Sequence, residues 1–325
     1  MKDSDWNLKL LASEIKSVRG LLDKNLVSIF PACNNLIDYY HANCGKMIRP
    51  KLLLLSAGAC GKITREHILA AAIFQVIHDA TLLHDDVIDE GILRRNTVTI
   101  NRRWGNRIAV LTGDLLLGHA IKMCLGLSSK VMSVIVKAIM KTCEGEICQD
   151  FNESCENISE QEYIRLIQMK SAEMFSQCCY LGAALSNASE EICGNLQHYG
   201  MLLGTAYQIL DDIDDIISED SRLGKSCGRD MHGRIITLPV IFYIQHGGEC
   251  DMLNNMSHDQ IADELIKSGS LDYCQNKLEL FCNEAIEFLS PLAESEYKLM
   301  LKNAARMISS KTQISVFKPC VNYSK

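Results

Sequence analysis

Two aspartate clusters with the same spacing lie far apart in the sequence. Their members are Asp85, Asp86, Asp89, Asp211, Asp212 and Asp215. Each cluster follows an apolar run, and because a helix turns once every ~3.6 residues, the first and last aspartate of a cluster share one helical face. Carboxylates this close repel each other and are costly to bury without a cation. The repeated spacing therefore predicts that both clusters belong to one metal site.

Basic residues elsewhere in the chain suggest what such a metal would help to bind. Carboxylate oxygens suit Mg²⁺, which is usually held by a few carboxylates together with substrate phosphates. Arginine offers a planar fork to phosphate oxygens and lysine a point charge. The candidate diphosphate ligands are Lys46, Arg49, His78, Arg94, Arg95, Lys170 and Lys225. Lys46 and Arg49 lie where a helix is predicted to open near Pro50, and the amides of a helix N-terminus attract anions.

The apolar side chains before the first cluster complete the chemistry. Ile73, Phe74, Ile77, Thr81 and Leu82 precede Asp85 on the same predicted helix, and they could line a pocket for a hydrocarbon. A diphosphate site above an apolar pocket describes a prenyl diphosphate. The sequence therefore favours an enzyme that acts on isoprenoids.

The elements that position these residues are predicted to be helical throughout. Only 5 Pro and 20 Gly interrupt the chain of 325 residues, and β-branched alternation is rare. A capping box is predicted at Ser159 and Glu162. Helices are expected over residues 8–22, 27–40, 52–60, 65–89, 106–125, 131–149, 159–185 and 188–217, and further helices over 235–311. No linker or shift of composition divides the chain, so residues 1–325 are predicted to form a single all-α domain.

Composition excludes several classes of function. A net charge of -7 argues against a nucleic-acid partner, which would need a basic face. The 15 cysteines contain no Cys-x-x-Cys pair, and Cys60, Cys124, Cys143 and Cys178 fall within apolar helical runs. These four are expected to be buried reduced thiols in a cytoplasmic protein. The polar, acidic N-terminus does not resemble a signal peptide, and no run was expected to be apolar and long enough to span a bilayer.

Taken together, the motifs resemble those of one enzyme family. They are Gly-Lys-x-x-Arg-Pro at 45–50, His-Asp-Asp-x-x-Asp at 84–89 followed by Arg94-Arg95, Lys170-Ser171, Tyr207-Gln208-x-x-Asp-Asp-x-x-Asp, and Gly224-Lys225. In this order they are similar to the trans-type isoprenyl (polyprenyl) diphosphate synthases, and the similarity extends over about residues 45–239. The family's known fold then implies a bundle of roughly ten or more helices around a central cavity.

The resemblance also implies roles for individual residues. The six motif aspartates would hold Mg²⁺, with three ions per active site. Isopentenyl diphosphate would be bound by Lys46, Arg49, His78 and Arg95. The allylic diphosphate would be held by Arg94, Lys170, Ser171, Gln208 and Lys225. Family members condense these two substrates, and the resemblance suggests a homodimer.

Three positions depart from the family pattern. Ser171 stands where threonine is common and keeps the hydroxyl group. Asn96 stands where glycine often follows the arginine pair, and Cys44 stands where glycine often precedes Gly45. None of these changes removes a motif side chain that carries charge.

Product length is inferred from the residues one helical turn before the first cluster. Ala80 and Thr81 are both small, whereas family enzymes with an aromatic residue there stop early. A small pair one turn from Asp85 predicts a product of about C25 or longer, with Phe74 or Ile77 as deeper floors of the pocket.

Four alternatives stay open at this point. A short-chain farnesyl or geranylgeranyl diphosphate synthase would use the same motifs. A class I terpene cyclase would share the fold, but its second motif normally has an Asn-Ser-Glu character that 211–215 lacks. A non-catalytic subunit of a heteromeric synthase would usually have lost an aspartate motif. A structural bundle would leave the ordered basic residues unexplained.

Overall fold

The structure is a computed structural model that describes residues 9–41, 45–151, 158–217, 237–254 and 256–310. Helices make up nearly all of it. After a short 3₁₀ turn at Lys9–Leu11, the α-helices are α1 Ala12–Asn25, α2 Pro31–His41, α3 Ile48–Cys60, α4 Arg65–Ile88, α5 Ile100–Trp104, α6 Asn106–Cys124, α7 Ser129–Phe151, α8 Glu160–Ile167, α9 Glu173–Ala184, α10 Glu190–Ile217, α13 Leu238–Gln245, α14 Cys250–Asn254, α15 His258–Lys267, α16 Ser270–Glu287 and α17 Glu296–Ser309. A π-helical turn, Gln168–Ala172, joins α8 to α9. The predicted all-α fold is confirmed.

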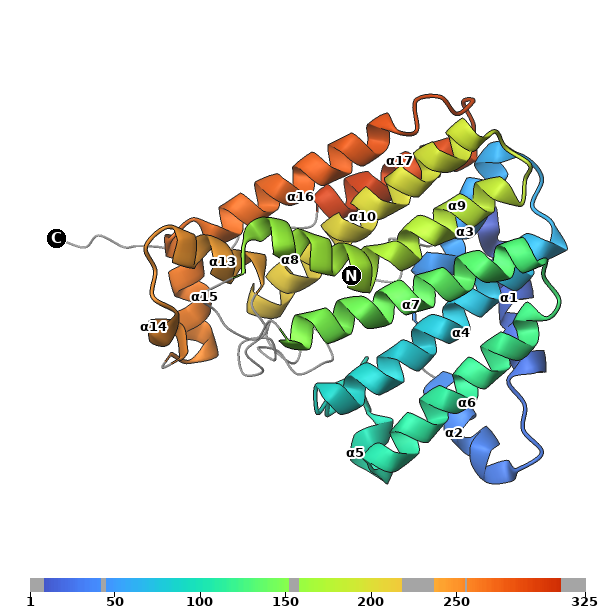
Figure 1. The fold of residues 1–325 in the computed structure, drawn as a ribbon, viewed down its shortest axis with the longest axis horizontal. Helices are drawn as coiled ribbons and strands as arrows, with labels where there is room; N and C mark the ends of the chain where they lie inside the picture. Colours follow the sequence, from blue (N-terminus) through green and yellow to red (C-terminus); the bar gives the residue numbers. More distant parts are fainter. Residues whose placement is uncertain (1–8, 42–44, 152–157, 218–236, 255, 311–325) are drawn as a thin grey trace.

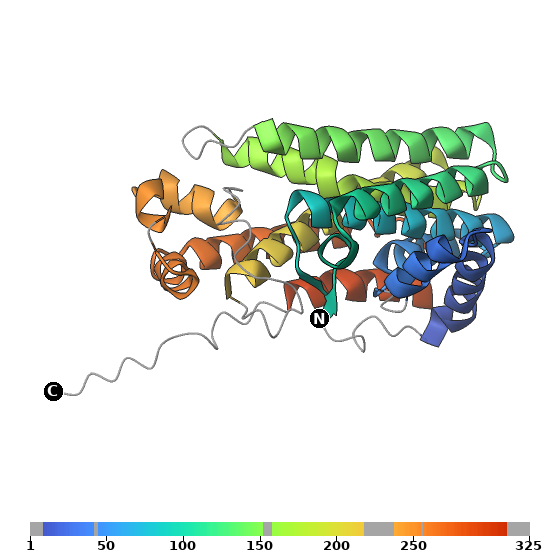
Figure 2. The same cartoon turned by 90° about the horizontal axis from the view of Figure 1, so that it is seen from below.

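The long helices pack as layers around α9 and α10 (Figures 1 and 2). Helix α3 packs on α9, α4 packs between α3 and α6, and α16 packs on α10. Figure 2 shows α7 on one face of the molecule and α17 toward the opposite face. In Figure 1 the C-terminal ends of α4, α7 and α10 all lie at the same end of the bundle. Both aspartate clusters are therefore carried to one end.

Local signals in the sequence explain several helix boundaries. The predicted capping box is present, because the Glu162 amide donates to the Ser159 hydroxyl at 3.2 Å and the Ser159 amide donates to the Glu162 carboxylate at 2.9 Å. The helix that carries the first cluster begins at Arg65, as predicted, with Thr64 as its N-cap. The helix predicted over 27–40 begins only at Pro31, as α2, since the fixed φ of proline suits a first turn.

The sequence did not predict the two-stranded hairpin that follows α4. Strand β1, Leu93–Arg94, pairs antiparallel with β2, Thr97–Val98. The two turn residues, Arg95 and Asn96, have φ of 53° and 62°, the positive values that such a tight hairpin requires. Asparagine tolerates positive φ better than most residues, so Asn96 can replace the glycine that is frequent in the family.

The core has one large part and one small part. The main cluster of buried side chains draws on residues from α1 to α17, while a smaller cluster forms around Ile216, Tyr243 and Leu265. Ile217 packs against both clusters. The single-domain assignment stays a prediction.

Two expectations from the sequence need correction. Within the described residues, α4 is long and apolar enough to cross a membrane by length and composition, although no such run was expected; 67% of its apolar window is buried, as in the core helix of a folded protein. The described cysteines are free thiols, but of the four predicted to be buried, Cys124 and Cys178 are buried, Cys60 is intermediate and Cys143 is exposed. Cys143 lies on the outward face of α7, which the apolar sequence around it concealed.

Candidate active site

The first aspartate cluster lies where α4 ends. Asp85 and Asp86 belong to its last turn, and Asp89 follows as the C-cap. The Asn101 amide nitrogen donates to the Asp86 carbonyl at 2.8 Å and to the Gly91 carbonyl at 3.0 Å, so α5 fixes the chain just after the cluster. Asp86 is buried, Asp85 is half-buried and Asp89 is exposed.

Electrostatics around Asp85 indicates a site that needs positive charge. Burial and, after it, the charge of Glu146 raise the pKa of Asp85 to about 7, against the opposing charges of Lys170 and Arg94. Glu146 belongs to α7, so acidic groups from two helices converge here. A bound cation would relieve the repulsion between these carboxylates.

The second cluster lies in the last two turns of α10, and its surroundings differ. Asp212 is 4% exposed; its carboxylate accepts a hydrogen bond from the Tyr163 hydroxyl and another, at 2.9 Å, from the Gln208 side-chain nitrogen. Burial raises the pKa of Asp212 to about 7, although both hydrogen bonds lower it. Asp215 is also buried, and its carbonyl accepts from His258 at 3.1 Å.

Lys170 links the two clusters. It lies on the π-helical turn and forms an ion pair with Glu146 at 2.9 Å. Burial opposes its charge, but Glu146, Asp85 and Asp89 together raise the Lys170 pKa above its ordinary value. The Lys170 charge also acts on Asp212. The charge of this one ammonium group therefore acts on carboxylates of both clusters.

Helix α7 approaches that turn closely because it carries a glycine there. A Cβ atom added to Gly145 would lie 2.6 Å from the Lys170 backbone nitrogen. This contact brings the next residue, Glu146, to Lys170. π-helical turns inside α-helices are frequent at functional sites.

Ser171 and Gln208 form a chain of two hydrogen bonds that ends at Asp212 of the second cluster. The Ser171 hydroxyl donates to the Gln208 side-chain oxygen at 2.6 Å, and Gln208 donates in turn to Asp212. The structure brings both residues together, as the motif order suggested. Their contacts orient a carboxylate, and their predicted contact with the allylic substrate stays a prediction.

The predicted basic residues also converge. The Arg95 guanidinium packs against Gly45, because a Cβ atom added to this glycine would lie 2.3 Å from a terminal nitrogen of Arg95. The segment that carries Lys46 therefore adjoins the hairpin. Burial, followed by the charges of Arg49, Arg95 and Arg94, lowers the pKa of His78 well below its ordinary value. A neutral histidine among three guanidinium groups is a suitable environment for an anion.

Arg49 lies in the first turn of α3 and is held by an aromatic ring. Its guanidinium carbon lies 5.1 Å from the centre of the Phe175 ring, a cation–π distance. Burial lowers the pKa of Arg49. Its Nε is buried without a hydrogen-bond partner among the described residues, so a polar group of this arginine is left to bind something else.

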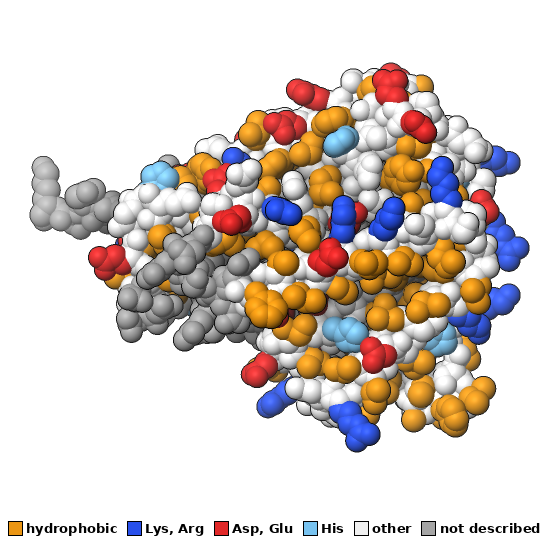
Figure 3. Space-filling model, in the orientation of Figure 1, with side chains coloured by type: hydrophobic (Ala, Val, Ile, Leu, Met, Phe, Trp, Pro, Cys, Tyr) orange, Lys and Arg blue, Asp and Glu red, His pale blue; other side chains and the backbone are white. Residues whose placement is uncertain are grey.

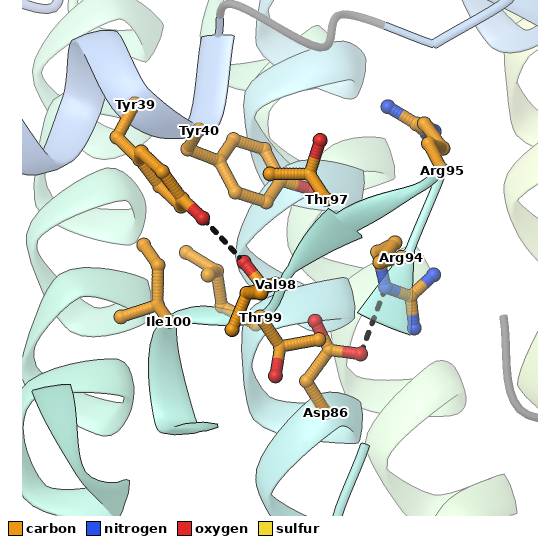
Figure 4. Close-up of a pocket in the computed structure, with 10 residues that line it drawn as sticks. Tyr39, Tyr40, Asp86, Arg94, Arg95, Thr97, Val98, Thr99 and Ile100 are labelled. Carbon is orange, nitrogen blue, oxygen red and sulfur yellow. Dashed lines mark hydrogen bonds and ion pairs between the residues drawn. The ribbon is translucent and has the colours of Figure 1, made fainter. Parts of the chain in front are cut away.

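A pocket opens between the hairpin, α2 and the end of α4 (Figure 4). The Tyr39 hydroxyl donates to the Val98 carbonyl at 2.7 Å, and Arg94 Nε donates to the Asp86 carboxylate at 2.8 Å. Tyr40, Thr97 and Arg95 lie along one side of it. The pocket is therefore lined by one aspartate of the first cluster, Asp86, and by the arginine pair Arg94 and Arg95.

The residues predicted to set product length lie deeper along α4. Phe74, Ile77 and Ala80 are each at most 1% exposed. Thr81 is half-buried, and its hydroxyl donates to the His78 carbonyl at 2.9 Å. Their role in the pocket stays a prediction, as does the role of Lys225, which lies outside the described residues.

The donor set fits a metal that shares its ligands with substrate. Within the described part of the chain, no three His, Cys, Asp or Glu side chains converge as a ready-made metal site. Mg²⁺ does not need such a cage, because it keeps several waters and is bound by one or two carboxylates plus phosphate oxygens. Asp85 and Asp89, with their mutual repulsion, supply donors of that kind.

Sequence reasoning missed two residues of this site. Glu146 pairs with Lys170, and Tyr163 binds Asp212. No motif in the sequence singles out Glu146 or Tyr163. A buried partner for a motif lysine could have been sought among acidic residues of neighbouring helices, but the sequence does not indicate which one.

A helical bundle that brings two aspartate clusters and a set of arginines and lysines to one end defines the class of enzymes that act on prenyl diphosphates. A family model described as polyprenyl synthetase matches residues 30–270. The chain belongs to this family, and it is a prenyltransferase of the polyprenyl diphosphate synthase type, as the motifs predicted.

Individual relatives agree over nearly the whole chain. Octaprenyl diphosphate synthase from Escherichia coli strain K12 is 32% identical over 310 residues, which cover 92% of this chain and 96% of the relative. Geranylgeranyl diphosphate synthase from Methanosarcina mazei is 31% identical over 93% of this chain and 98% of the relative. The crystal structure of polyprenyl synthase from Caulobacter crescentus CB15, complexed with calcium and isoprenyl diphosphate, superposes with a TM-score of 0.89 at 27% identity, over 95% of this chain and 98% of that chain.

Proposed function

We propose that this enzyme condenses isopentenyl diphosphate with an allylic prenyl diphosphate to make a polyprenyl diphosphate of medium or long chain. The observation that supports it best is the position of Lys170, whose charge acts on Asp85 and Asp89 of one cluster and on Asp212 of the other. A diphosphate at Lys170 is then within reach of both clusters.

The chemistry of each group follows from its surroundings. When bound, Mg²⁺ neutralises the charge that builds on the departing diphosphate. Lys170 and Arg94 would bind the same group and help the allylic carbon–oxygen bond to break. The double bond of isopentenyl diphosphate then attacks the allylic cation, and loss of a proton to the released diphosphate completes a product five carbons longer.

The two substrates are assigned to two halves of the site. Lys46, Arg49, His78 and Arg95 would hold isopentenyl diphosphate, since the charges of Arg49 and Arg95 both act on His78. Arg94, Lys170, Ser171, Gln208 and Lys225 would hold the allylic substrate. The six motif aspartates would hold the ions, for which the family resemblance implied three Mg²⁺.

An incorporation assay tests the reaction. The protein alone is incubated with radiolabelled isopentenyl diphosphate, Mg²⁺ and a short allylic primer, and extracted label is counted. Mg²⁺-dependent incorporation is expected, and none without the primer. Incorporation only after a second chain is added would favour a subunit of a heteromeric synthase, and a cyclic hydrocarbon product would favour a terpene cyclase.

Product length is tested separately. Ala80 is fully buried one turn before Asp85, so the larger ring in Ala80→Phe should close the pocket and shorten the product. Chromatography should show about C25 or longer from the unmodified enzyme and a shorter chain from the variant. Ala80→Ser replaces one small side chain with another and should leave the product length unchanged. A product of C15 or C20 from the unmodified enzyme would contradict the assignment.

The enzyme is further proposed to be a homodimer through α6 and α7. Both helices carry exposed apolar side chains at matched helical spacing: Val110, Ile121 and Leu125 along α6 and its C-cap, and Val136, Ile147 and Phe151 along α7. Figure 3 shows apolar side chains gathered over this face. Contiguous apolar surface of this kind is typical of an interface.

A solution mass measurement checks this assembly. The unmodified protein should have twice the mass of the chain, and Met140→Glu, at a position on α7 that is 56% exposed, should shift it to the monomer. Leu280→Glu on α16, at a position 49% exposed, is the matched control and should stay dimeric. A monomeric unmodified protein would contradict the proposal.

A cytoplasmic location is proposed on the thiol-rich composition alone.

A further inference from the structure

One buried carboxylate near the basic residues has no part in the site as assigned so far. Asp79 follows His78 on α4, six residues before Asp85, and it is 2% exposed. It belongs to neither aspartate cluster. A buried carboxylate is costly unless polar partners surround it, so its neighbours indicate what it does.

Those neighbours bind only one of the two carboxylate oxygens of Asp79. Asp79 Oδ1 accepts hydrogen bonds from the Gln75 side-chain nitrogen at 2.9 Å and from the Tyr40 hydroxyl at 3.4 Å. Asp79 Oδ2 is buried and has no hydrogen-bond partner among the described residues. Buried polar atoms without a partner are rare, and each calls for an explanation.

The charges of two arginines of the basic half act on the same carboxylate. Burial raises the pKa of Asp79 to about 7, while the charge of Arg95, the bonds from Gln75 and Tyr40, and the charge of Arg49 all lower it. Arg49 shows the matching deficit, because its Nε is also buried without a partner in the described chain. The charges of Asp79 and Arg49 therefore act on each other, while each side chain keeps one buried polar atom without a hydrogen-bond partner among the described residues.

We propose that Asp79 is a positioning residue for the isopentenyl diphosphate half of the site, where its carboxylate orients the guanidinium groups of Arg49 and Arg95 toward the diphosphate. Gln75 and Tyr40 hold the carboxylate in place from α4 and α2. The assignment rests on the proposed function, since it takes the two arginines as ligands of that substrate.

Charge alone predicts the opposite effect. A carboxylate near a diphosphate site repels the ligand, so its removal would strengthen binding if Asp79 acted only through its charge. Its removal weakens binding if the carboxylate holds two arginines in the geometry that a diphosphate needs. The direction of the change therefore decides between a positioning role and mere proximity.

Equilibrium binding and kinetics of Asp79→Asn provide the test. The amide keeps the shape and removes the charge. Calorimetry without metal should show isopentenyl diphosphate binding weakened about tenfold, or about 1.4 kcal/mol. In the incorporation assay the KM for isopentenyl diphosphate should rise by a similar factor, while the KM for the allylic primer changes less than about twofold, because Lys170 and Arg94 are untouched.

Two further variants keep the test decisive. Tyr40→Phe removes only the longer of the two hydrogen bonds and should weaken the same affinity by about two- to threefold. Glu173→Gln is the matched control: Glu173 is also 2% exposed and also bonds a glutamine one turn away, at 2.8 Å, but its cationic partner is Lys141. It should leave isopentenyl diphosphate binding unchanged.

The outcomes separate this inference from the proposed function. Equal or tighter binding by Asp79→Asn, in protein with unchanged helical content, would overturn the positioning role while the synthase assignment stands. Failure of the unmodified protein to bind isopentenyl diphosphate or to incorporate label would overturn the proposed function itself. A rise in the allylic KM equal to that for isopentenyl diphosphate would also count against the positioning role.

Discussion

The two aspartate clusters share one spacing but not one environment. In the first, the buried Asp86 is bound by a cation, the Arg94 guanidinium at 2.8 Å. In the second, the equivalent Asp212 is bound by two neutral donors, Tyr163 and Gln208. The last members differ as well, because Asp89 is exposed beyond the end of α4 whereas Asp215 is buried within α10.

This difference assigns different tasks to the two clusters. Arg94 bonds Asp86 and is also proposed to bind the allylic diphosphate, so the first cluster can exchange an internal ion pair for a contact with substrate. Neutral donors hold Asp212 in place without pairing it with a cation, so the second cluster is ordered within a helix. We therefore expect the first cluster to respond to substrate and the second to stay in place.

The largest expected effect comes from removing the carboxylate of Asp85, on which the charge of Lys170 acts. Asp85→Ala should lower kcat by about a hundred- to a thousandfold, the loss typical of one group that stabilises transition-state charge. The helical circular dichroism signal should be unchanged, because the bond of α4 that involves Asp85 runs from the Asp89 amide to the Asp85 backbone carbonyl, which alanine keeps. Glu90→Gln, an exposed carboxylate next to the cluster, should stay within about twofold. Retained turnover in Asp85→Ala would overturn the metal assignment.

A smaller loss is expected when the ion pair of the first cluster is broken. Arg94→Met leaves Asp86 buried without its guanidinium and removes a proposed phosphate ligand, so kcat/KM for the allylic primer should fall by about ten- to a hundredfold. Steady-state kinetics with varied primer measures it. Arg102→Met on α5, an exposed arginine, is the control. Equal kinetics in the two variants would show that the Arg94 ion pair is only structural.

The motifs and most helices could be predicted from the sequence because they depend on local signals. Arg65 as a helix start, the Ser159 capping box and Gly61 as the end of α3 all follow from a few neighbouring residues. The charged groups were found for a similar reason, since a repeated Asp-Asp-x-x-Asp spacing can be recognised without knowing the fold. Their roles toward substrate came from the resemblance to a family.

Contacts between distant helices could not be predicted in this way. Tyr163 and Asp212 are 49 residues apart, and Tyr40 and Asp79 are 39 apart, so no local pattern links them. The hairpin was missed because each strand has two residues, too few for an alternating pattern. The exposure of Cys143 was missed because an apolar helical run does not reveal which face meets solvent.

The smallest expected effect sharpens the contrast between the clusters. Tyr163→Phe removes one neutral donor while Gln208 still holds Asp212, so kcat/KM for the allylic primer should fall only about three- to tenfold. Tyr273→Phe is the matched control, because its hydroxyl also donates to a carboxylate, Glu160, which belongs to neither cluster. The control should change kcat/KM by less than about twofold. If Tyr163→Phe lost as much activity as Arg94→Met, the two clusters would be equally sensitive, and the distinction between a responsive cluster and a fixed one would fail.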